Sequence, residues 1–268
     1  MWVVCCGMMR SGSTLQFNLA NTLVQELNVG ESDGFFYQPE QFTDAVTKEH
    51  DRSKWQVVKC HYWWPEVEAL KQEAPVKFIY SYRDLRDVAA SWVEMQQLKF
   101  NAGYIRDMLQ DAVKHFDIWT SQPDVLVSRY ETDLRANSGK EVIRIASHLN
   151  LKITEGLASD LAERCNMKAQ RAKIASFDYE KEGQPVMNTR FDPVTQLHNR
   201  HILNGESGRW KTVLSPVQVD QIEGWFGDWL VEHGYPLRER RWFKDGLRNT
   251  QMQVVSMWNR TRSKVRLT

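Results

Sequence analysis

Short apolar segments alternate with amphipathic ones in the first half of the chain, and this alternation restricts the fold more than any other feature. Four segments are predominantly apolar and short enough to be strands: residues 2–7, 55–60, 76–82 and 125–129. Helical periodicity follows them in residues 14–28, 65–73, 86–97, 104–121 and 139–149. Apolar strands that alternate with helices are typical of a parallel sheet covered on both faces. The sequence therefore predicts an α/β fold with a central parallel β-sheet flanked by helices.

The second half of the chain is less regular. Gly30 is expected to end the first helix near its C-cap. Residues 168–204 are polar and weakly periodic, which predicts a long irregular excursion, and helical periodicity returns at 216–233. No repeat or linker divides the chain, so we expect one domain over residues 1–268.

The C-terminal residues, 238–268, carry most of the charge asymmetry. They hold nine Lys or Arg and two Asp or Glu, so their charge is +7 while the rest of the chain carries −6. This segment is expected to be a basic C-terminal extension or helix. Two roles remain open for it, a solvated terminus or an attractor for an anionic nucleotide or acceptor.

Overall composition excludes several classes of protein. The formal net charge is only +1, which argues against a nucleic-acid partner. No apolar run reaches 18 residues, so no membrane span is expected, and the first apolar run lacks the preceding basic region of a signal peptide. The four cysteines (positions 5, 6, 60 and 165) lack CxxC spacing and two are adjacent, so we expect buried thiols and a cytoplasmic location.

The segment between the first strand and the first helix is the strongest indication of function. Gly7 and Gly12 have the spacing of a Walker A loop, and a glycine-bearing turn that opens a helix directs backbone N–H groups at one point. Ser13 stands where that motif requires lysine, followed by Thr14, and the basic residue is Arg10 inside the loop. The pattern indicates an anion site, with a plain strand-turn-helix corner as the alternative.

Polar residues also follow the other apolar segments. Lys59 and His61 come at the end of the second segment, and Arg83 leaves the third, with Ser91 on the helix after it. In a parallel sheet these positions converge at the carboxyl edge, where open α/β sheets bind ligands. A guanidinium suits a phosphate, and an imidazole can accept a proton near neutral pH. The alternatives are a solvated Arg83 and a structural His61.

Five segments in order resemble the motifs of PAPS-dependent sulfotransferases, where PAPS is 3′-phosphoadenosine 5′-phosphosulfate. Arg10-Ser11-Gly12-Ser13-Thr14 resembles the 5′-phosphosulfate-binding loop, and residues 57–61 resemble the Lys-x-His segment of the cytosolic type. Residues 78–91 resemble the 3′-phosphate motif, and 125–134 the strand that ends in Tyr-Glu. Residues 205–211 are similar to the late Gly-x-x-Gly-x-Trp-Lys segment. The resemblance implies a fold like that of P-loop nucleotide kinases.

The resemblance also implies roles in sulfonate transfer. Arg10, with Ser11, Gly12, Ser13 and Thr14, is expected to hold the 5′-phosphosulfate. His61 is expected to be the general base for the acceptor. Lys59, together with Arg10, is expected to contact the transferring sulfonate. These three residues are the expected catalytic group.

Further residues are expected to bind the rest of the nucleotide. Arg83 and Ser91 correspond to the 3′-phosphate site and Tyr130 to an adenine contact. Three residues are expected to close over the nucleotide: Gly205, Gly208 and Arg209. The sequence departs from the cytosolic pattern at Leu15, where a tryptophan is usual, and at residues 203–204, where an Arg-Lys pair is usual. Arg200 and Arg209 are the nearby candidates to replace that pair.

The expected function is transfer of a sulfonate from PAPS to a hydroxyl or amine of a small-molecule acceptor, leaving 3′,5′-ADP (PAP), without a metal. One rival is a Walker-type kinase or ATPase, against which Ser13 argues. Another is a non-catalytic nucleotide-binding protein, against which His61 argues. The acceptor and the oligomeric state remain open. Several aromatic residues could line an acceptor pocket or belong to the core: Phe35, Phe36, Tyr37, Phe42, Tyr62, Trp63 and Trp64.

Overall fold

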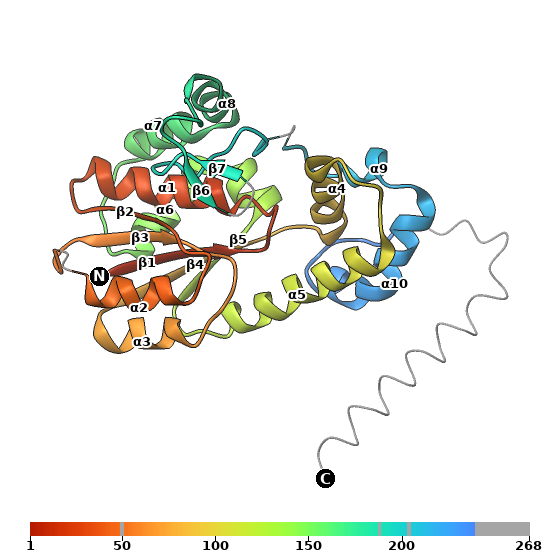
Figure 1. The fold of residues 1–268 in the computed structure, drawn as a ribbon, viewed down its shortest axis with the longest axis horizontal. Helices are drawn as coiled ribbons and strands as arrows, with labels where there is room; N and C mark the ends of the chain where they lie inside the picture. The colour runs from red at the N-terminus through yellow and green to blue at the C-terminus, as the bar shows by residue number, and fades with distance from the viewer. Residues whose placement is uncertain (49–50, 187–188, 203–204, 239–268) are drawn as a thin grey trace, which may run out of the picture. The chain divides into compact units, whose positions relative to one another are not determined.

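The computed structural model describes residues 1–48, 51–186, 189–202 and 205–238, which divide after residue 214 into two compact units. The first unit contains a five-stranded parallel sheet with the order β2-β3-β1-β4-β5 (Figure 1). Its strands are β1 (Trp2–Gly7), β2 (Gly30–Phe35), β3 (Trp55–Lys59), β4 (Val76–Tyr82) and β5 (Val125–Arg129). The prediction of a central parallel sheet is confirmed. β1 is buried along its whole length, as expected of a central strand covered on both faces.

Strand β2 was not expected from the sequence. Its residues, GESDGF, are mostly polar and only partly buried, because β2 lies at the edge of the sheet and pairs with β3 alone. The expectation that Gly30 ends the first helix is wrong. Helix α1 (Ser13–Glu26) ends earlier, and Gly30 begins β2, where a Cβ would lie 2.5 Å from the Trp55 carbonyl oxygen.

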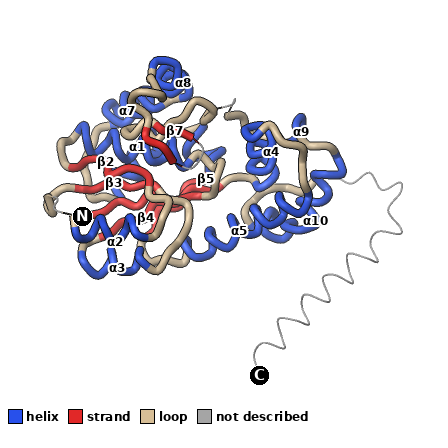
Figure 2. The backbone as a smooth tube through the Cα atoms, in the orientation of Figure 1, coloured by secondary structure: helices blue, strands red, loops and turns tan. Residues whose placement is uncertain are grey.

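Helices cover both faces of the sheet, and the strands lie between them (Figure 2). On one face α1 packs with α6 (Ser138–His148) and α7 (Glu155–Cys165), and these three helices share a hydrophobic cluster with the central strands. On the other face lie α2 (Glu40–Thr47), α3 (Glu66–Glu73) and part of α5 (Ala102–Thr120). Helix α4 (Leu85–Gln96) follows β4, and a short π-helix, η1 (Tyr130–Arg135), follows β5. The helices predicted between the apolar segments are found within two residues of their expected bounds.

The expectation of an irregular excursion over residues 168–204 is wrong in part. Helix α8 (Met167–Ser176) occupies its start, and β6 (Gln184–Val186) pairs antiparallel with β7 (Thr189–Phe191). Gln170 is the only buried residue of α8, so this helix has no apolar face that periodicity could reveal. Helix α7 does bury one face, with Ala158, Leu161, Ala162 and Cys165 at helical spacing, and the sequence reading missed that signal.

The described part of the second unit contains helix α10 (Pro216–Glu232), and this confirms the helix expected there. Ser215 caps it in a reciprocal capping box with Gln218, and proline stands at the first helical position. Predictions about the basic segment beyond residue 238 fall outside the described residues. Among the described residues, no helix is both long and apolar enough to cross a membrane.

Candidate active site

The loop between β1 and α1 is held by Ser11, whose side chain is fully buried. The Ser11 hydroxyl lies 2.7 Å from the Met8 carbonyl oxygen, and 3.0 and 2.9 Å from the carbonyl oxygen and hydroxyl of Ser81 on β4. Gly12 then begins α1 with a φ of 84°, and a Cβ there would lie 2.6 Å from the Tyr130 ring. Only glycine combines this left-handed backbone with that close approach.

The first turn of α1 faces a cavity of about 260 Å³ beyond the carboxyl edge of the sheet. No side chain caps this turn and it contains no acidic residue, so its N–H groups and positive helix end are available to an anion. The structure brings most of the expected site residues to the wall of this cavity: Arg10, Gly12, Ser13, Thr14, Lys59, His61, Arg83, Ser91, Tyr130, Gly205 and Arg209. Ser11 and Gly208 do not line it. Ser11 lies under the loop, and the Gly208 N–H donates to Asp87.

Arg83 connects three parts of this wall. Its terminal nitrogens donate to the carbonyl oxygens of Arg10 at 3.3 Å and Glu206 at 2.6 Å. Its guanidinium lies over the Tyr130 ring, 4.3 Å from the centroid. Arg83 Nε is buried and has no hydrogen-bond partner among the described residues. A buried donor without a partner is costly, so this nitrogen marks a place where a ligand oxygen would be stabilised.

Residues 205–210 form the next part of the wall and are fastened from two sides. The Gly205 carbonyl accepts from the Tyr130 hydroxyl at 2.7 Å. The Asp87 carboxylate accepts from the backbone N–H groups of Gly208 at 2.7 Å and Trp210 at 2.9 Å. Arg209 is paired with Glu94, with 2.6 Å between the guanidinium and the carboxylate. These bonds hold residues 205–210 against α4.

Arg10 points from the loop across the cavity. Its Nε donates to the Ser91 hydroxyl at 3.0 Å, and a terminal nitrogen donates to the His201 carbonyl at 3.1 Å. Burial, together with the nearby charge of Arg83, lowers the pKa of Arg10 to about 10. The unfavourable environment of this cation is what an anionic ligand would relieve.

Lys59 is the last residue of β3 and His61 follows two residues later, and both line the cavity. The Lys59 ammonium lies 4.2 Å from the centroid of the Phe35 ring, and burial lowers its pKa to about 7. His61 Nδ1 lies 2.8 Å from the Gly7 carbonyl oxygen. A carbonyl can only accept, so Nδ1 carries the proton and Nε2 of the neutral ring keeps its lone pair. Burial, with the Lys59 charge, lowers the pKa of His61 to about 3, so the ring is neutral at pH 7.

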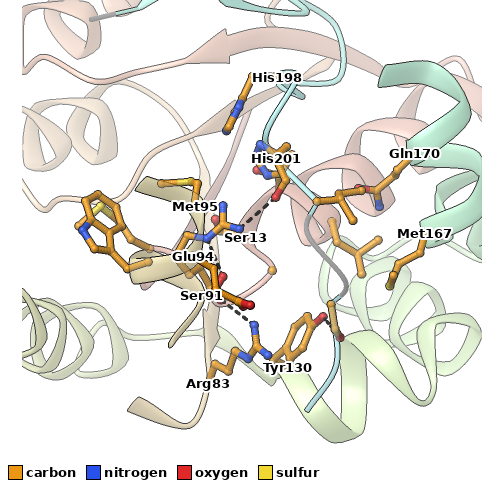
Figure 3. A pocket seen from close by; sticks show the side chains of 18 of the residues that line it. Ser13, Arg83, Ser91, Glu94, Met95, Tyr130, Met167, Gln170, His198 and His201 are labelled. Carbon is orange, nitrogen blue, oxygen red and sulfur yellow. Dashed lines mark hydrogen bonds between the residues drawn. The ribbon is translucent and has the colours of Figure 1, made fainter. Parts of the chain in front are cut away.

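The sequence analysis missed several residues that line the cavity. His198 and His201 come from the segment after β7, and Met167 and Gln170 come from α8. In Figure 3 the two histidines lie at the end of the cavity away from Arg83 and Tyr130. For His198 and His201, the only signal in the sequence is their His-x-x-His spacing within a polar stretch. Among the described residues no group of three or more His, Cys, Asp or Glu is arranged to hold a metal.

The aromatic residues near the second strand divide into two groups. Phe35 lines the cavity. Trp63 instead packs on Trp119, with 4.7 Å between ring centroids, and Phe36 packs on Phe42 at 5.0 Å. Phe36 and Phe42 therefore belong to the core, and the other aromatic side chains of this set are only partly buried.

The structure also shows where the chain departs from the motif pattern of the cytosolic type. Leu15, where a tryptophan is usual, lines the cavity. Arg200 lies outside the cavity and lines a separate polar hollow. Residues 203–204 lie outside the described residues.

The sulfotransferase domain family matches residues 3–234, nearly the whole of the described chain. The chain belongs to the sulfotransferase family. This match confirms the expected class of enzyme and does not favour the kinase alternative. No curated protein is similar enough in sequence to count as a match.

Solved sulfotransferase structures share the fold of this family member. Retinol dehydratase in complex with androsterone and the inactive cofactor PAP is 20% identical, with a TM-score of 0.59 and coverage of 89% of this chain and 82% of that chain. A mouse sulfotransferase complexed with PAP is 13% identical, with a TM-score of 0.56 and coverage of 86% and 84%. The expected fold, like that of P-loop nucleotide kinases, is confirmed for this sulfotransferase.

Proposed function

We propose that this sulfotransferase moves a sulfonate from PAPS to a hydroxyl or amine of a small-molecule acceptor and releases PAP. The observation that carries the proposal is the meeting of Arg10 and Lys59 with the uncapped start of α1 around one cavity. Lys59 is buried and Arg10 is half-buried, and both have lowered pKa values, so the site is stabilised by an anion with several charges. The phosphosulfate of PAPS is such an anion.

The residues present fit the nucleotide. The unpartnered Arg83 Nε and the Ser91 hydroxyl are our candidates for the 3′-phosphate. The loop and the first turn of α1 would hold the 5′-phosphosulfate. Leu15, Met167 and Tyr130 would contact the adenine, in place of the tryptophan that is usual after the loop. Gly205 and Arg209 lie in the fastened segment that would cover the nucleotide.

The chemistry assigned to the chain is a single in-line transfer. His61 Nε2 accepts the proton of the acceptor hydroxyl while the acceptor oxygen bonds to sulfur. The bond between sulfur and the bridging phosphate oxygen breaks, and its electron pair leaves with PAP. Lys59 and Arg10 offset the charge on the sulfonate and bridging oxygens. Positioning and charge stabilisation supply most of the rate in such transfers.

The solved relatives support a small-molecule acceptor, since one structure of retinol dehydratase contains androsterone and another contains retinol, each with PAP. We place both compact units in one sulfotransferase domain, because the family match continues across residue 214. The four cysteines are all buried and unpaired, which supports a reducing compartment such as the cytoplasm.

Thermal unfolding with PAP, 5′-AMP or Mg-ATP tests the donor. A ligand at 100 times its Kd adds about 2.7 kcal/mol of apparent stability, so PAP is expected to raise Tm clearly. 5′-AMP lacks the 3′-phosphate and is expected to have little effect at equal concentration. Ser91→Ala should reduce the preference for PAP. A larger Tm increase with Mg-ATP than with PAP would overturn the proposal in favour of a kinase.

A further inference from the structure

Two side chains of α5 bond to the backbone beside the proposed base. His115 and Trp119 are one turn apart on this helix and lie on one face of it. The Trp119 indole N–H donates to the His61 carbonyl oxygen, with 3.3 Å between nitrogen and oxygen. Two residues along the chain, the Trp63 backbone N–H donates to His115 Nδ1 at 3.1 Å. Together these bonds hold the main chain that carries the imidazole of His61.

The position of His61 is therefore fixed through its ring and through its backbone. The ring bonds through Nδ1 to the Gly7 carbonyl at 2.8 Å. The backbone is held by Trp119, whose side chain is fully buried and packs on the Trp63 ring with 4.7 Å between centroids. A catalytic group that is misplaced by about 1 Å can lose about 100-fold in rate. The contacts from α5 thus bear on the direction of His61 Nε2.

His115 is the member of this arrangement that can titrate. A backbone N–H only donates, so His115 Nδ1 must be unprotonated and the neutral ring carries its proton on Nε2. That nitrogen lies 3.6 Å from the carboxylate of Asp111, one turn earlier on α5. Protonation would place a second hydrogen on Nδ1, directly against the Trp63 N–H. The bond to Trp63 therefore requires a neutral His115.

The charged and titratable groups that face His115 come from two segments of the described chain. Asp111 and Lys114 lie on α5, and the Tyr62 ring, after β3, meets the imidazole edge-on with 5.1 Å between centroids. Burial lowers the pKa of His115 below its usual 6.5 against the opposing charge of Asp111, and Lys114 adds to the lowering. Burial raises the pKa of Tyr62, so its hydroxyl stays neutral. His115 is therefore neutral at pH 7 and gains a proton as the pH falls below 6.5.

We propose that His115 and Trp119 are positioning residues for His61, and that protonation of His115 releases the Trp63 N–H and lets the backbone of the base move. This proposal rests on the proposed sulfotransferase function, in which His61 is the base. Neither His115 nor Trp119 lines the cavity, so both act on the reaction through His61 and not through the donor. Acidification thus disturbs the base from outside the cavity.

The ring signals of His61 in ¹⁵N NMR spectra of the full chain, recorded without PAP between pH 8.5 and 5, test the proposal. The pKa of His61 is about 3, so its own ring does not titrate in this range. Lys59, with a pKa of about 7, is expected to move the His61 signals in every variant. A second step is expected in the wild type at the lower pH where the signals of His115 itself titrate. His61→Asn and His115→Asn assign the two sets of signals.

Two substitutions at His115 separate the lost bond from the added charge. His115→Asn places an amide oxygen near the position of Nδ1, which can accept the Trp63 N–H at every pH. His61 should then resemble the wild type at pH 7.5 and lose the second step. His115→Phe has no acceptor and no charge, so His61 should differ from the wild type already at pH 7.5 and resemble it at pH 5.

Two further variants test the partners of the bond. Asp111→Asn, at a half-exposed position, removes the carboxylate that favours protonated His115. It should lower the midpoints of His115 and of the second His61 step together, by about 0.4 of a pH unit. Trp119→Phe keeps a ring against Trp63 but has no N–H. It should shift the His61 signals at pH 7.5 and keep the second step.

His148→Asn is the matched control. His148 also lies on a helix beside a carboxylate, with 3.7 Å between Nδ1 and Asp124, and burial lowers its pKa as well. Its Nε2 bonds to the Phe78 carbonyl at 3.1 Å instead of to the segment after β3. The control is expected to leave both steps of His61 unchanged.

Several results would overturn the proposal. One is a His61 ring that shows no step at the midpoint of His115, and another is a step that persists in His115→Asn. A His115→Phe spectrum in which His61 matches the wild type at pH 7.5 would show that only the charge of His115 acts. If His115→Phe does not fold, Asp111→Asn decides, because a midpoint that moves for His115 alone would separate the two histidines.

The same spectra keep this proposal apart from the proposed function. They are recorded without PAP, so they report the link between His115 and His61 whether or not the protein binds a nucleotide. Failure of PAP to raise Tm would reject the proposed sulfotransferase function and leave that link measured. A missing link in a protein that PAP stabilises would reject the positioning role alone.

Discussion

Arg10 Nε donates a hydrogen bond to Ser91 Oγ at 3.0 Å, although 81 residues separate them in the chain. The sequence assigns Arg10 to the 5′-phosphosulfate and Ser91 to the 3′-phosphate. The structure thus connects side chains expected at two different parts of the donor. The same guanidinium also donates to the His201 carbonyl, at the end of the cavity away from Arg83 (Figure 3). Arg10 is therefore our candidate for a side chain that connects the proposed donor and acceptor sites.

This connection predicts that Arg10 and Ser91 act together in PAP binding. Arg10→Lys keeps a charge but removes Nε, and Ser91→Ala removes the hydroxyl. Each single change is expected to weaken PAP binding about tenfold, on the scale of a charge-assisted hydrogen bond. Isothermal titration of the double variant should show a coupling energy of about 1 kcal/mol. Additivity of the two losses within about 0.3 kcal/mol would contradict the connection.

A second prediction separates the two nitrogens of His61. In His61→Asn the amide nitrogen can occupy the place of Nδ1 and keep the bond to the Gly7 carbonyl, while the base at Nε2 is lost. Single turnover of labelled PAPS with an acceptor is expected to slow by about 100-fold or more, the usual scale of general-base catalysis. PAP affinity should stay near the wild-type value. Near-normal turnover would remove His61 from the mechanism.

The lowered pKa of Lys59 predicts that the protein takes up a proton when PAP binds. Its pKa is lowered to about 7 in the free protein, because the side chain is buried beside the Arg10 charge. At pH 8 such a group is about one-tenth protonated, and a bound phosphate raises its pKa, so close to one proton enters per PAP. Affinity for PAP should therefore decrease as the pH rises above 7.

Calorimetry of PAP binding at pH 8, in two buffers of different ionisation enthalpy, measures this uptake. Lys59→Met is expected to bind PAP with a proton uptake near zero. An unchanged uptake in Lys59→Met would show that another group takes the proton.

The backbone conformation of Gly12 predicts that alanine there destabilises the protein, whereas alanine at Gly103 does not. Gly12→Ala would adopt a φ of 84° and bring its Cβ to 2.6 Å from the Tyr130 ring. Thermal unfolding is expected to show a loss of about 1–3 kcal/mol together with weaker PAP binding. At Gly103, in the exposed first turn of α5, an added Cβ would have only Asn101 Oδ1 nearby, at 3.5 Å, so Gly103→Ala should leave Tm unchanged or slightly higher. Equal effects of the two changes would contradict the role assigned to Gly12.

The strands β1, β3, β4 and β5 could be predicted from the sequence because each is a short, mostly apolar segment between helical ones, as expected of a parallel sheet covered by helices. The first turn of α1, Lys59, His61 and Arg83 could be predicted as one site for a related reason. Each stands at or just after the end of a strand, and parallel strands direct their carboxyl ends to the same edge of the sheet. These properties are local to each segment and depend on the sequence alone.

Tertiary structure decided the features whose causes lie far away in the chain. β2 is a strand because β3 offers it an edge, and its polar residues carry no apolar pattern. His201 joins the site through its carbonyl bond to Arg10, across 191 residues, and no periodicity near residue 201 could announce that contact. The tautomer of His198 depends likewise on the backbone nitrogen that the turn at Arg200 brings to its Nδ1. Hydrogen-bond partners and pKa values are set by neighbours in space, so they appear only once the chain has folded.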